Sequence, residues 1–489
     1  MAPYRLVLLL LILASVRLLH LSSEIDLPHS WRQYDTKQYI DSYYYGEADF
    51  LAPSVCWMGG HKTLLLEFPL PEYLIAKLYS VFGPDILVAR FFFLAFFVLS
   101  AFFLYKSLKL VFKDTWIPEM ATLIYGMAPL SLFYSRAIHI DFFVLAFSTG
   151  FLYYMLRALL EKRMRWLWIA WGFACVGFVT KAPYIFFLAL PILVFAIQKK
   201  HLKWLLMRAW IFMVPVLLLY LWTNYTKEVN GRIPDWSYIP NFNRFTSMWY
   251  WYFGVWGQRM MASNWLLLGE RLVTEVTGFI GCSALVIGLL IGKKNQAWWW
   301  AVSLFGGTIL YTLVFFNLNL MHDYYQLPFT ISLSVLIALG IEVVFRRIPW
   351  QKLRVGAMGM LTLIVALEGV RFAENNFYTR NEDFEKIAEE IRKNSSPEDL
   401  VIVCFGGLSP QCPLILQPAN RFGWSIPIHD MTPELIYRLY KEAGATRLAV
   451  VYNGYFEGEF QLFFEAMEEK IGIPLDDKGA ALYMCKLKM

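Results

Sequence analysis

The sequence predicts an α-helical polytopic membrane protein with about eleven transmembrane helices and a small C-terminal α/β domain. Three observations lead to this fold class. The 489 residues are 58% hydrophobic and 18% aromatic, but only 17% are charged, and soluble domains carry about 25% charged residues. Long apolar runs alternate with short basic clusters along most of the chain. After residue 374, apolar runs of membrane length give way to amphipathic segments.

The apolar runs are close to the ~20 residues that a helix needs to cross the hydrocarbon core of a bilayer. The first run follows Arg5 and lacks a small-x-small cleavage site, so we interpret it as a retained helix and not as a signal peptide. The runs lie at roughly 3–21, 84–106, 115–134, 140–160, 166–182, 184–198, 205–223, 266–292, 297–316, 324–345 and 354–373.

Basic clusters follow alternate runs and predict the orientation of the chain. They lie at 106–113, 162–165, 199–208, 293–294 and 346–354. By the positive-inside rule these loops are cytoplasmic. The N-terminus then lies in the cytoplasm, and residues after about 374 lie outside the plasma or inner membrane. The net charge of +6 therefore reflects topology, and we expect no nucleic-acid partner.

Two domains are predicted. Residues 1–373 form the transmembrane domain, with an outer loop at 22–83 that carries interfacial helices, and residues 374–489 form an extracytoplasmic α/β domain. In the second domain, helical periodicity at 384–391, 433–443 and 459–471 alternates with strand-like runs at 400–405, 447–452 and 481–487. No catalytic motif occurs there, which indicates a structural or acceptor-recognition role.

The six cysteines show no metal-ligand spacing. Cys404 and Cys412 could form a disulfide if their domain faces an oxidising compartment, or remain two buried thiols.

Ionisable residues gather near the ends of the runs that face outside. Such groups are costly at membrane depth and usually face a cavity or one another, so their common side predicts a polar site. The stretch from His29 to Asp41 suits a helix at the membrane surface. Within it, Arg32 and Lys37 flank Asp35 and should favour its ionised form.

A lipid phosphate that carries a sugar suits this group of residues. Cations stabilise the charge that develops on the phosphate as the C–O bond breaks, and a carboxylate can accept the proton of an acceptor hydroxyl. Asp35 is the predicted base, with Arg136, Lys181 and Lys62 at the phosphate. The remaining predicted substrate-binding residues are Arg32, His322 and Tyr325.

Two further acidic residues, Glu67 and Asp141, could orient the sugar or the base, or bind a metal ion. The sequence itself requires no cofactor. Purely structural roles remain open for several residues: Arg136 and Lys181 could be snorkelling anchors, and His322 could lie beside a helix cap formed by Asp323. Arg90, inside the second run, needs a partner because a charge there is costly.

Several short motifs occur in a fixed order along residues 1–375. An Asp lies in the first outer loop, and an acidic-Pro-x-Pro element precedes the second run. The later motifs are Phe82-Gly83-Pro84-Asp85, Ala89-Arg90, Met127-Ala128-Pro129, Ser135-Arg136, Asp141, Thr180-Lys181-Ala182-Pro183 and His322-Asp323-Tyr324-Tyr325-Gln326-Leu327-Pro328. The set resembles the integral-membrane GT-C glycosyltransferases of the aminoarabinose-transferase and protein O-mannosyltransferase type.

The resemblance implies an inverting transfer from a polyprenyl-phosphate sugar to a lipid, glycan or protein acceptor on the outer face. It assigns the catalytic acid/base role to Asp35 and permits a divalent metal near Glu67 and Asp141. Phe68 stands where the aminoarabinose enzymes carry Lys, so the donor sugar stays open. Two alternatives are a polysaccharide polymerase or ligase that uses lipid-pyrophosphate donors, and a secondary transporter. The transporter is disfavoured because no internal repeat occurs.

Overall fold

A computed structural model describes residues 4–237, 249–379, 382–406, 409–452, 467–475 and 481–487. By its internal contacts the chain forms two units, and neither is continuous in sequence. The first unit comprises Met1–Ser23, Asp85–Asn224 and Met248–Tyr378. The second comprises Glu24–Pro84, Tyr225–Ser247 and Thr379–Met489, so it joins much of the predicted outer loop to the C-terminal segment. The predicted domain boundary at residue 373 stays a prediction.

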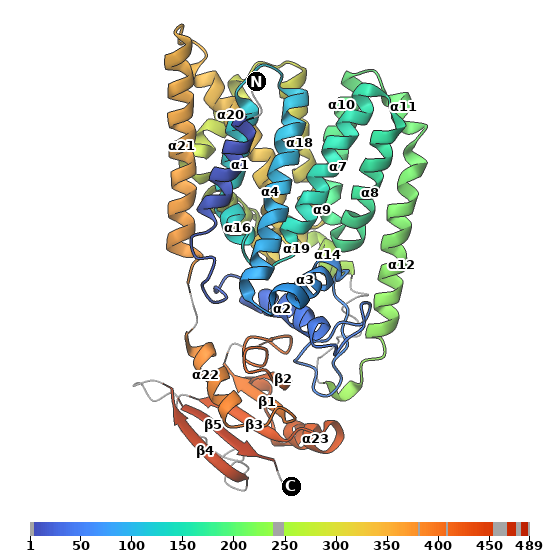
Figure 1. Cartoon of the computed structure of the whole chain (residues 1–489), viewed down its shortest axis with the longest axis vertical. Helices are drawn as coiled ribbons and strands as arrows, with labels where there is room; N and C mark the ends of the chain where they lie inside the picture. Colours follow the sequence, from blue (N-terminus) through green and yellow to red (C-terminus); the bar gives the residue numbers. More distant parts are fainter. Residues whose placement is uncertain are drawn as a thin grey trace. The chain divides into compact units, whose positions relative to one another are not determined.

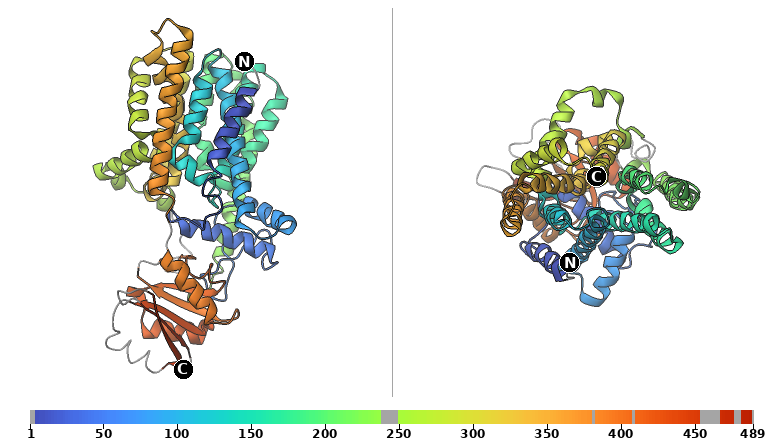
Figure 2. Two further views of the ribbon diagram at one scale, coloured as in Figure 1. Left: turned by 60° about the vertical axis from the view of Figure 1, so that its left-hand side comes forward. Right: turned by 90° about the horizontal axis from the view of Figure 1, so that it is seen from above.

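The first unit is a bundle of helices that run side by side and are seen end-on in the right panel of Figure 2 (Figures 1 and 2). Its helices are α1 (Tyr4–Val16), α4 (Ile86–Val111), α5 (Ile117–Met127), α6 (Pro129–Tyr134), α7 (Asp141–Glu161), α8 (Met164–Lys181), α9 (Pro183–Phe186), α10 (Ala189–Gln198), α11 (Leu202–Leu206), η1 (Ala209–Phe212), α12 (Met213–Asn230), α14 (Trp249–Phe253), α15 (Trp256–Met260), α16 (Ala262–Arg271), the π-helix η3 (Leu272–Thr277), α17 (Gly278–Ile291), α18 (Gln296–Val314), α19 (Phe316–Met321), η4 (Asp323–Gln326), α20 (Leu327–Phe345) and α21 (Gln351–Asn376). The last turns of α12 belong to the second unit.

A multi-pass membrane protein is confirmed. Within the described residues, seven helical segments are long and apolar enough to cross a membrane. Two shorter apolar segments, Tyr4–Val16 and Pro183–Gln198, add to them. The predicted count of eleven spans stays a prediction. The seven segments are Ile86–Val111, Asp141–Glu161, Ala209–Asn230, Ala262–Ile291, Gln296–Val314, Asp323–Phe345 and Gln351–Asn376.

Proline accounts for one break within a predicted span. The run expected at 115–134 is divided into α5 and α6, which meet at Ala128 with an extended ψ of 137°. Proline lacks an N–H and clashes with a helical residue before it, so Pro129 ends one helix and begins the next.

Glycines allow α17 and α20 to pack backbone to backbone. A Cβ on Gly340 would lie 1.8 Å from the carbonyl oxygen of Ala284, and one on Gly288 would lie 2.3 Å from that of Leu336. Small residues permit such close approach between membrane helices.

The second unit contains a five-stranded sheet in the order β2-β1-β3-β5-β4. β1 pairs in parallel with β2 and β3, whereas β5 pairs antiparallel with β3 and β4. This confirms the small C-terminal α/β fold. The elements of the unit are α2 (Ser30–Tyr44), α3 (Leu70–Phe82), η2 (Asp235–Ser237), α22 (Glu382–Lys393), β1 (Leu400–Phe405), β2 (Phe422–Pro427), η5 (Ile428–Asp430), α23 (Pro433–Ala443), β3 (Arg447–Tyr452), β4 (Glu468–Pro474) and β5 (Ala481–Lys486).

The prediction of a helix at 459–471 is wrong for the residues that the structure describes. Residues 468–471 begin strand β4, and residues 459–466 lie outside the described part of the chain. β4 pairs with β5 along one edge of the sheet, so sheet pairing overrides the helical periodicity of its sequence.

One face of the sheet packs on α23. Ile402 and Val450 from the strands, with Ile436 and Leu439 from α23, belong to a common buried cluster. Alternation along a strand sends neighbouring side chains to opposite faces, so β1, β2 and β3 each contribute every second residue to this cluster.

The loop between α2 and α3 (residues 45–69, the α2–α3 loop) covers the edge of strand β2. The Gly59 N–H donates to the carbonyl of Gly423 over 2.7 Å, and the Gly423 N–H donates to the carbonyl of Cys56 over 2.9 Å. Strand β2 thus has β1 on one side and this loop on the other.

Candidate functional site

The predicted base, Asp35, lies in the middle of α2 with only 2% of its surface exposed. Its Oδ1 accepts a 2.8 Å hydrogen bond from the indole Nε1 of Trp57, which is 1% exposed. One helical turn earlier, the guanidinium of Arg32 forms an ion pair with Glu67 in the α2–α3 loop. The structure therefore brings together three predicted residues, Asp35, Arg32 and Glu67, and adds an indole that sequence reasoning missed.

Burial controls the charge of Asp35. Loss of solvation raises the pKa of its carboxyl to about 7, against the opposing effects of Arg32 and the Trp57 hydrogen bond. The expectation that Arg32 and Lys37 keep this group ionised is wrong, because burial outweighs Arg32 and because Lys37 pairs with Asp41 at 2.5 Å. A carboxyl with a pKa near 7 can gain and lose a proton at neutral pH, as a general base must.

A second buried carboxyl, Glu72, lies in the first turn of α3 and was also missed by sequence reasoning. Burial raises its pKa to about 8, while Arg32 opposes this and Glu67 adds to it. The available signal was a second acid five residues after Glu67, but the pattern of the chain did not show that it is buried.

Lys62, predicted to contact the lipid phosphate, lies over the ring of Phe422 at 3.7 Å. This cation–π contact joins the α2–α3 loop to the first residue of β2. Nearby, the Asn230 side chain donates to the Leu65 carbonyl over 2.8 Å and accepts from the Leu65 N–H over 2.9 Å. These contacts hold the loop at Lys62 and at Leu65, shortly before Glu67.

In the first unit, Asp141 and Lys181 form a buried ion pair with 2.5 Å between carboxylate and ammonium. Asp141 begins α7 and Lys181 ends α8. His139 Nδ1 lies 2.8 Å from the other carboxylate oxygen. The Lys181 ammonium also lies over the rings of Tyr324 and Tyr325 at 4.7 and 4.3 Å. Three predicted residues, Asp141, Lys181 and Tyr325, thus lie together, and His139 joins them.

His322 packs against the same aromatic group. Its ring stacks on Tyr324 with centroids 5.0 Å apart and planes 7° apart. Asp323 accepts a 2.6 Å hydrogen bond from the Tyr134 hydroxyl. Asp323 thus contacts α6, and the N-cap residue of η4, His322, makes no side-chain cap hydrogen bond.

Two arginines hold the chain where it leaves α1. The Arg136 guanidinium donates to the carbonyl of His20 over 2.8 Å and to the Ser23 hydroxyl over 3.3 Å, and it lies 4.5 Å over the Tyr378 ring. Arg90 donates to the carbonyl of Leu21 over 2.7 Å and to that of Ser23. Arg90 therefore has partners, as we expected, and they include these two backbone oxygens. The predicted phosphate contact of Arg136 stays a prediction.

The predicted acids do not form a metal site in the described part of the chain. No group of three or more His, Cys, Asp or Glu residues there could hold a metal ion. Glu67 lies in the second unit and is paired with Arg32, whereas Asp141 lies in the first and is paired with Lys181. Within its own unit, neither acid is joined by described residues into a donor set that fits a divalent cation.

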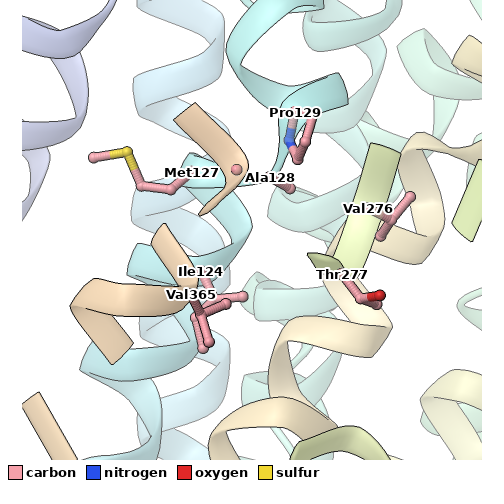
Figure 3. Close-up of a pocket in the computed structure, with 8 residues that line it drawn as sticks. Ile124, Met127, Ala128, Pro129, Val276, Thr277 and Val365 are labelled. Atoms are coloured by element: carbon pink, nitrogen blue, oxygen red, sulfur yellow. The ribbon is translucent and has the colours of Figure 1, made fainter. Parts of the chain in front are cut away.

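A small apolar hollow lies in the first unit. Figure 3 shows side chains from α5, η3 and α21 around it. None of the predicted substrate-binding residues lines it. Its lining residues are Ile124, Met127, Ala128, Pro129, Val276, Thr277, Val365 and Gly369.

Comparison with known proteins matches one segment of the chain to a family model. Residues 67–225 match the model of the dolichyl-phosphate-mannose-protein mannosyltransferase family. No curated protein matches the sequence of the chain.

Solved structures with the same fold include ArnT from Cupriavidus metallidurans bound to undecaprenyl phosphate, with a TM-score of 0.60 and 13% identity over 99% of this chain and 98% of ArnT. A second is the archaeal oligosaccharyltransferase AglB from Archaeoglobus fulgidus, in complex with an inhibitory peptide and a dolichol-phosphate. Its TM-score is 0.55 and its sequence identity 12%, over 98% of this chain and 74% of AglB. The arabinofuranosyltransferase AftD from Mycobacteria has a TM-score of 0.56 and 11% sequence identity, over 100% of this chain and 40% of AftD.

The chain has the GT-C fold. The segment that matches the family model begins at Glu67 and includes Arg136, Asp141 and Lys181. Asp35 precedes the matched segment.

Proposed function

We propose that this protein is a membrane glycosyltransferase that moves a sugar from a polyprenyl-phosphate donor to an acceptor hydroxyl or phosphate, with inversion and with Asp35 as the base. The observation that carries the proposal is the buried Asp35 carboxyl, oriented by Trp57 and with a pKa near 7. The undecaprenyl phosphate in ArnT and the dolichol-phosphate in AglB support the choice of lipid.

In the proposed reaction, the ionised Asp35 takes the proton of the acceptor hydroxyl while the acceptor oxygen attacks the anomeric carbon. The bond between that carbon and the phosphate oxygen breaks, and the bonding electrons leave with the polyprenyl phosphate. Attack opposite the leaving phosphate inverts the anomeric centre. A positioned general base is typically worth about 10²–10⁴ in rate.

Cations are needed where charge develops on the leaving phosphate. Lys181 is the candidate with the most defined surroundings, since Asp141 and two tyrosine rings hold its ammonium. Arg136, Lys62 and Arg32 complete the proposed phosphate-binding set, with His322 and Tyr325 at the sugar.

In the proposed orientation the N-terminus lies in the cytoplasm and residues after about 374 lie outside the plasma or inner membrane. The basic clusters between apolar helices support it. Reporter fusions after residue 378 should report an outside location, and a cytoplasmic signal would overturn both the topology and the outer-face site.

The test of the reaction uses purified protein in lipid nanodiscs and a panel of radiolabelled sugars on undecaprenyl phosphate, with crude envelope glycolipids and glycoproteins as acceptors. Wild type should transfer one of these sugars, and Asp35→Asn should lose about 10²–10⁴-fold in rate while still binding undecaprenyl phosphate. Asp41→Asn makes the same change on the same helix and should keep its activity.

Near-normal transfer by Asp35→Asn would exclude Asp35 as the base. The panel also contains sugars on undecaprenyl pyrophosphate. Transfer from these donors alone would favour the polymerase or ligase alternative instead.

A further inference from the structure

The indole of Trp57 orients the Asp35 carboxylate. An indole N–H can only donate a hydrogen bond, so its 2.8 Å bond to Oδ1 requires an acceptor oxygen at that place. With Oδ1 held, proton transfer falls to Oδ2. Both side chains are buried, and a hydrogen bond in such surroundings is stronger than one in water.

Trp57 is itself held by the C-terminal sheet. It lies between Cys56, whose carbonyl accepts from the Gly423 N–H, and Gly59, whose N–H donates to the Gly423 carbonyl. Met58 forms an antiparallel bridge with Trp424. Because β2 is an edge strand, its free backbone groups can hold an added segment in the manner of β-augmentation.

Gly59 makes this docking possible. Its φ is +61°, and a Cβ at this residue would lie 2.0 Å from the ring of Trp424. Any side chain here would meet both a strained backbone and a buried indole that is 1% exposed. The segment therefore lies against Trp424 only because residue 59 has no side chain.

We propose that Trp57 is a positioning residue for Asp35 and that edge strand β2 of the C-terminal sheet holds Trp57 in place. The inference rests on the proposed function, in which Asp35 is the base. It gives the C-terminal α/β part of the chain a role in transfer, because the residue that orients the base is anchored to it.

The titration of Asp35 reports this contact. Its pKa is raised by burial and lowered by Arg32 and by the Trp57 bond. Loss of the bond should therefore raise the pKa further. The titratable groups around Asp35 come from α2, from the α2–α3 loop and from the segment after β1, and they are Arg32, Tyr39, Cys56, Glu67 and Cys412.

The first experiment measures the Asp35 titration directly. Infrared difference spectra of full-length protein in nanodiscs follow the C=O stretch of the protonated carboxyl, assigned by its absence in Asp35→Asn. A hydrogen bond to a charged group is worth enough to move a pKa by about one to two units. We expect Trp57→Phe to move the midpoint upward by that amount. Trp300→Phe, the same change at another buried indole, should not move it.

The transfer assay gives the functional counterpart. In Trp57→Phe, the acidic limb of the pH profile should move upward with the infrared midpoint, and kcat should fall more than KM changes. Trp57→His keeps an N–H donor and should recover part of the rate. An unchanged midpoint in Trp57→Phe would overturn the proposal. A shifted midpoint together with an active Asp35→Asn would instead contradict only the assignment of Asp35 as the base.

The second experiment tests the anchor. Gly59→Ala should lower transfer in the wild-type background and have little further effect in Trp57→Phe, because contacts that act through one residue are not additive. Gly60→Ala is the matched control, since its Cβ would meet only Leu400 at an ordinary 3.7 Å. Equal losses from Gly59→Ala in both backgrounds would show that the anchor does not act through Trp57.

Discussion

The ammonium of Lys181 lies 2.5 Å from the carboxylate of Asp141, and both side chains are almost fully buried. Each end of the pair comes from a different helix, α8 and α7. A buried charge that loses its partner is strongly destabilising, whereas removal of both charges is often neutral. The pair is thus a structural contact as well as a proposed part of the phosphate site.

We predict that Lys181→Met and Asp141→Asn each destabilise the folded protein by about 3–5 kcal/mol, and that the double variant recovers folded yield. Thermal unfolding in detergent, followed by size-exclusion recovery, measures this. The exposed pair Arg232–Glu228 is the control, and its removal should have little effect. If the recovered double variant transfers sugar normally, Lys181 has no role at the phosphate.

The rate of transfer should depend on the protonation of Asp35. The pKa of its carboxyl is raised by burial to about 7, and a base works only when it is ionised. We therefore expect kcat/KM to rise with pH and level off above about 7, with a loss of about tenfold per pH unit below it. A profile that stays flat from pH 5 to 8 would contradict the assignment.

Asp35→Asn should stabilise the second unit at high pH. The folded pKa of Asp35 lies above its unfolded value, so ionisation costs folding free energy above about pH 7 and nothing below about pH 4. The variant should resist unfolding better than wild type at pH 8 and equally at pH 4. Hydrogen exchange in peptides from β1 and β2 measures the difference. Equal protection of the variant and the wild type at both pH values would mean that ionisation of Asp35 does not destabilise the folded protein.

Gly340→Ala should disrupt the contact between α17 and α20. The new Cβ would lie 1.8 Å from the Ala284 carbonyl oxygen, and overpacking of this kind typically costs about 1–3 kcal/mol. Gly356→Ala in α21 meets nothing within 4 Å and should leave the melting temperature unchanged. A normal melting temperature for Gly340→Ala would show that the two helices can separate without loss.

The sequence was informative where the physical signal is local. Hydropathy located α4, α7, α18, α20 and α21 because each crossing needs its own apolar length. The α/β pattern of the C-terminal part was also predictable. The edge strands β2 and β4 were not, because β2 contains Gly423 and Trp424 in a short mixed run and β4 begins with three charged residues.

The site was less predictable, because its partners are distant in sequence. Asp141 and Lys181 were each expected at the site, but their pairing follows from the packing of α7 on α8. Trp57 carries no charge, and its role emerges only when Gly423 is brought beside the α2–α3 loop. The charge of Asp35 was misjudged because neighbouring residues in the sequence do not report burial.

The pairing of Gly59 with Gly423 also sets an order for biogenesis. The loop is synthesised about 360 residues before the strand that completes it, and at about 5–20 residues per second the nascent chain waits roughly 20–70 s. During that time the membrane helices are inserted while Trp57 lacks its anchor. Transfer activity should appear only after β2 leaves the ribosome. Protease protection of the α2–α3 loop should therefore differ between stalled chains in which β2 is still inside the exit tunnel and longer chains in which it has emerged.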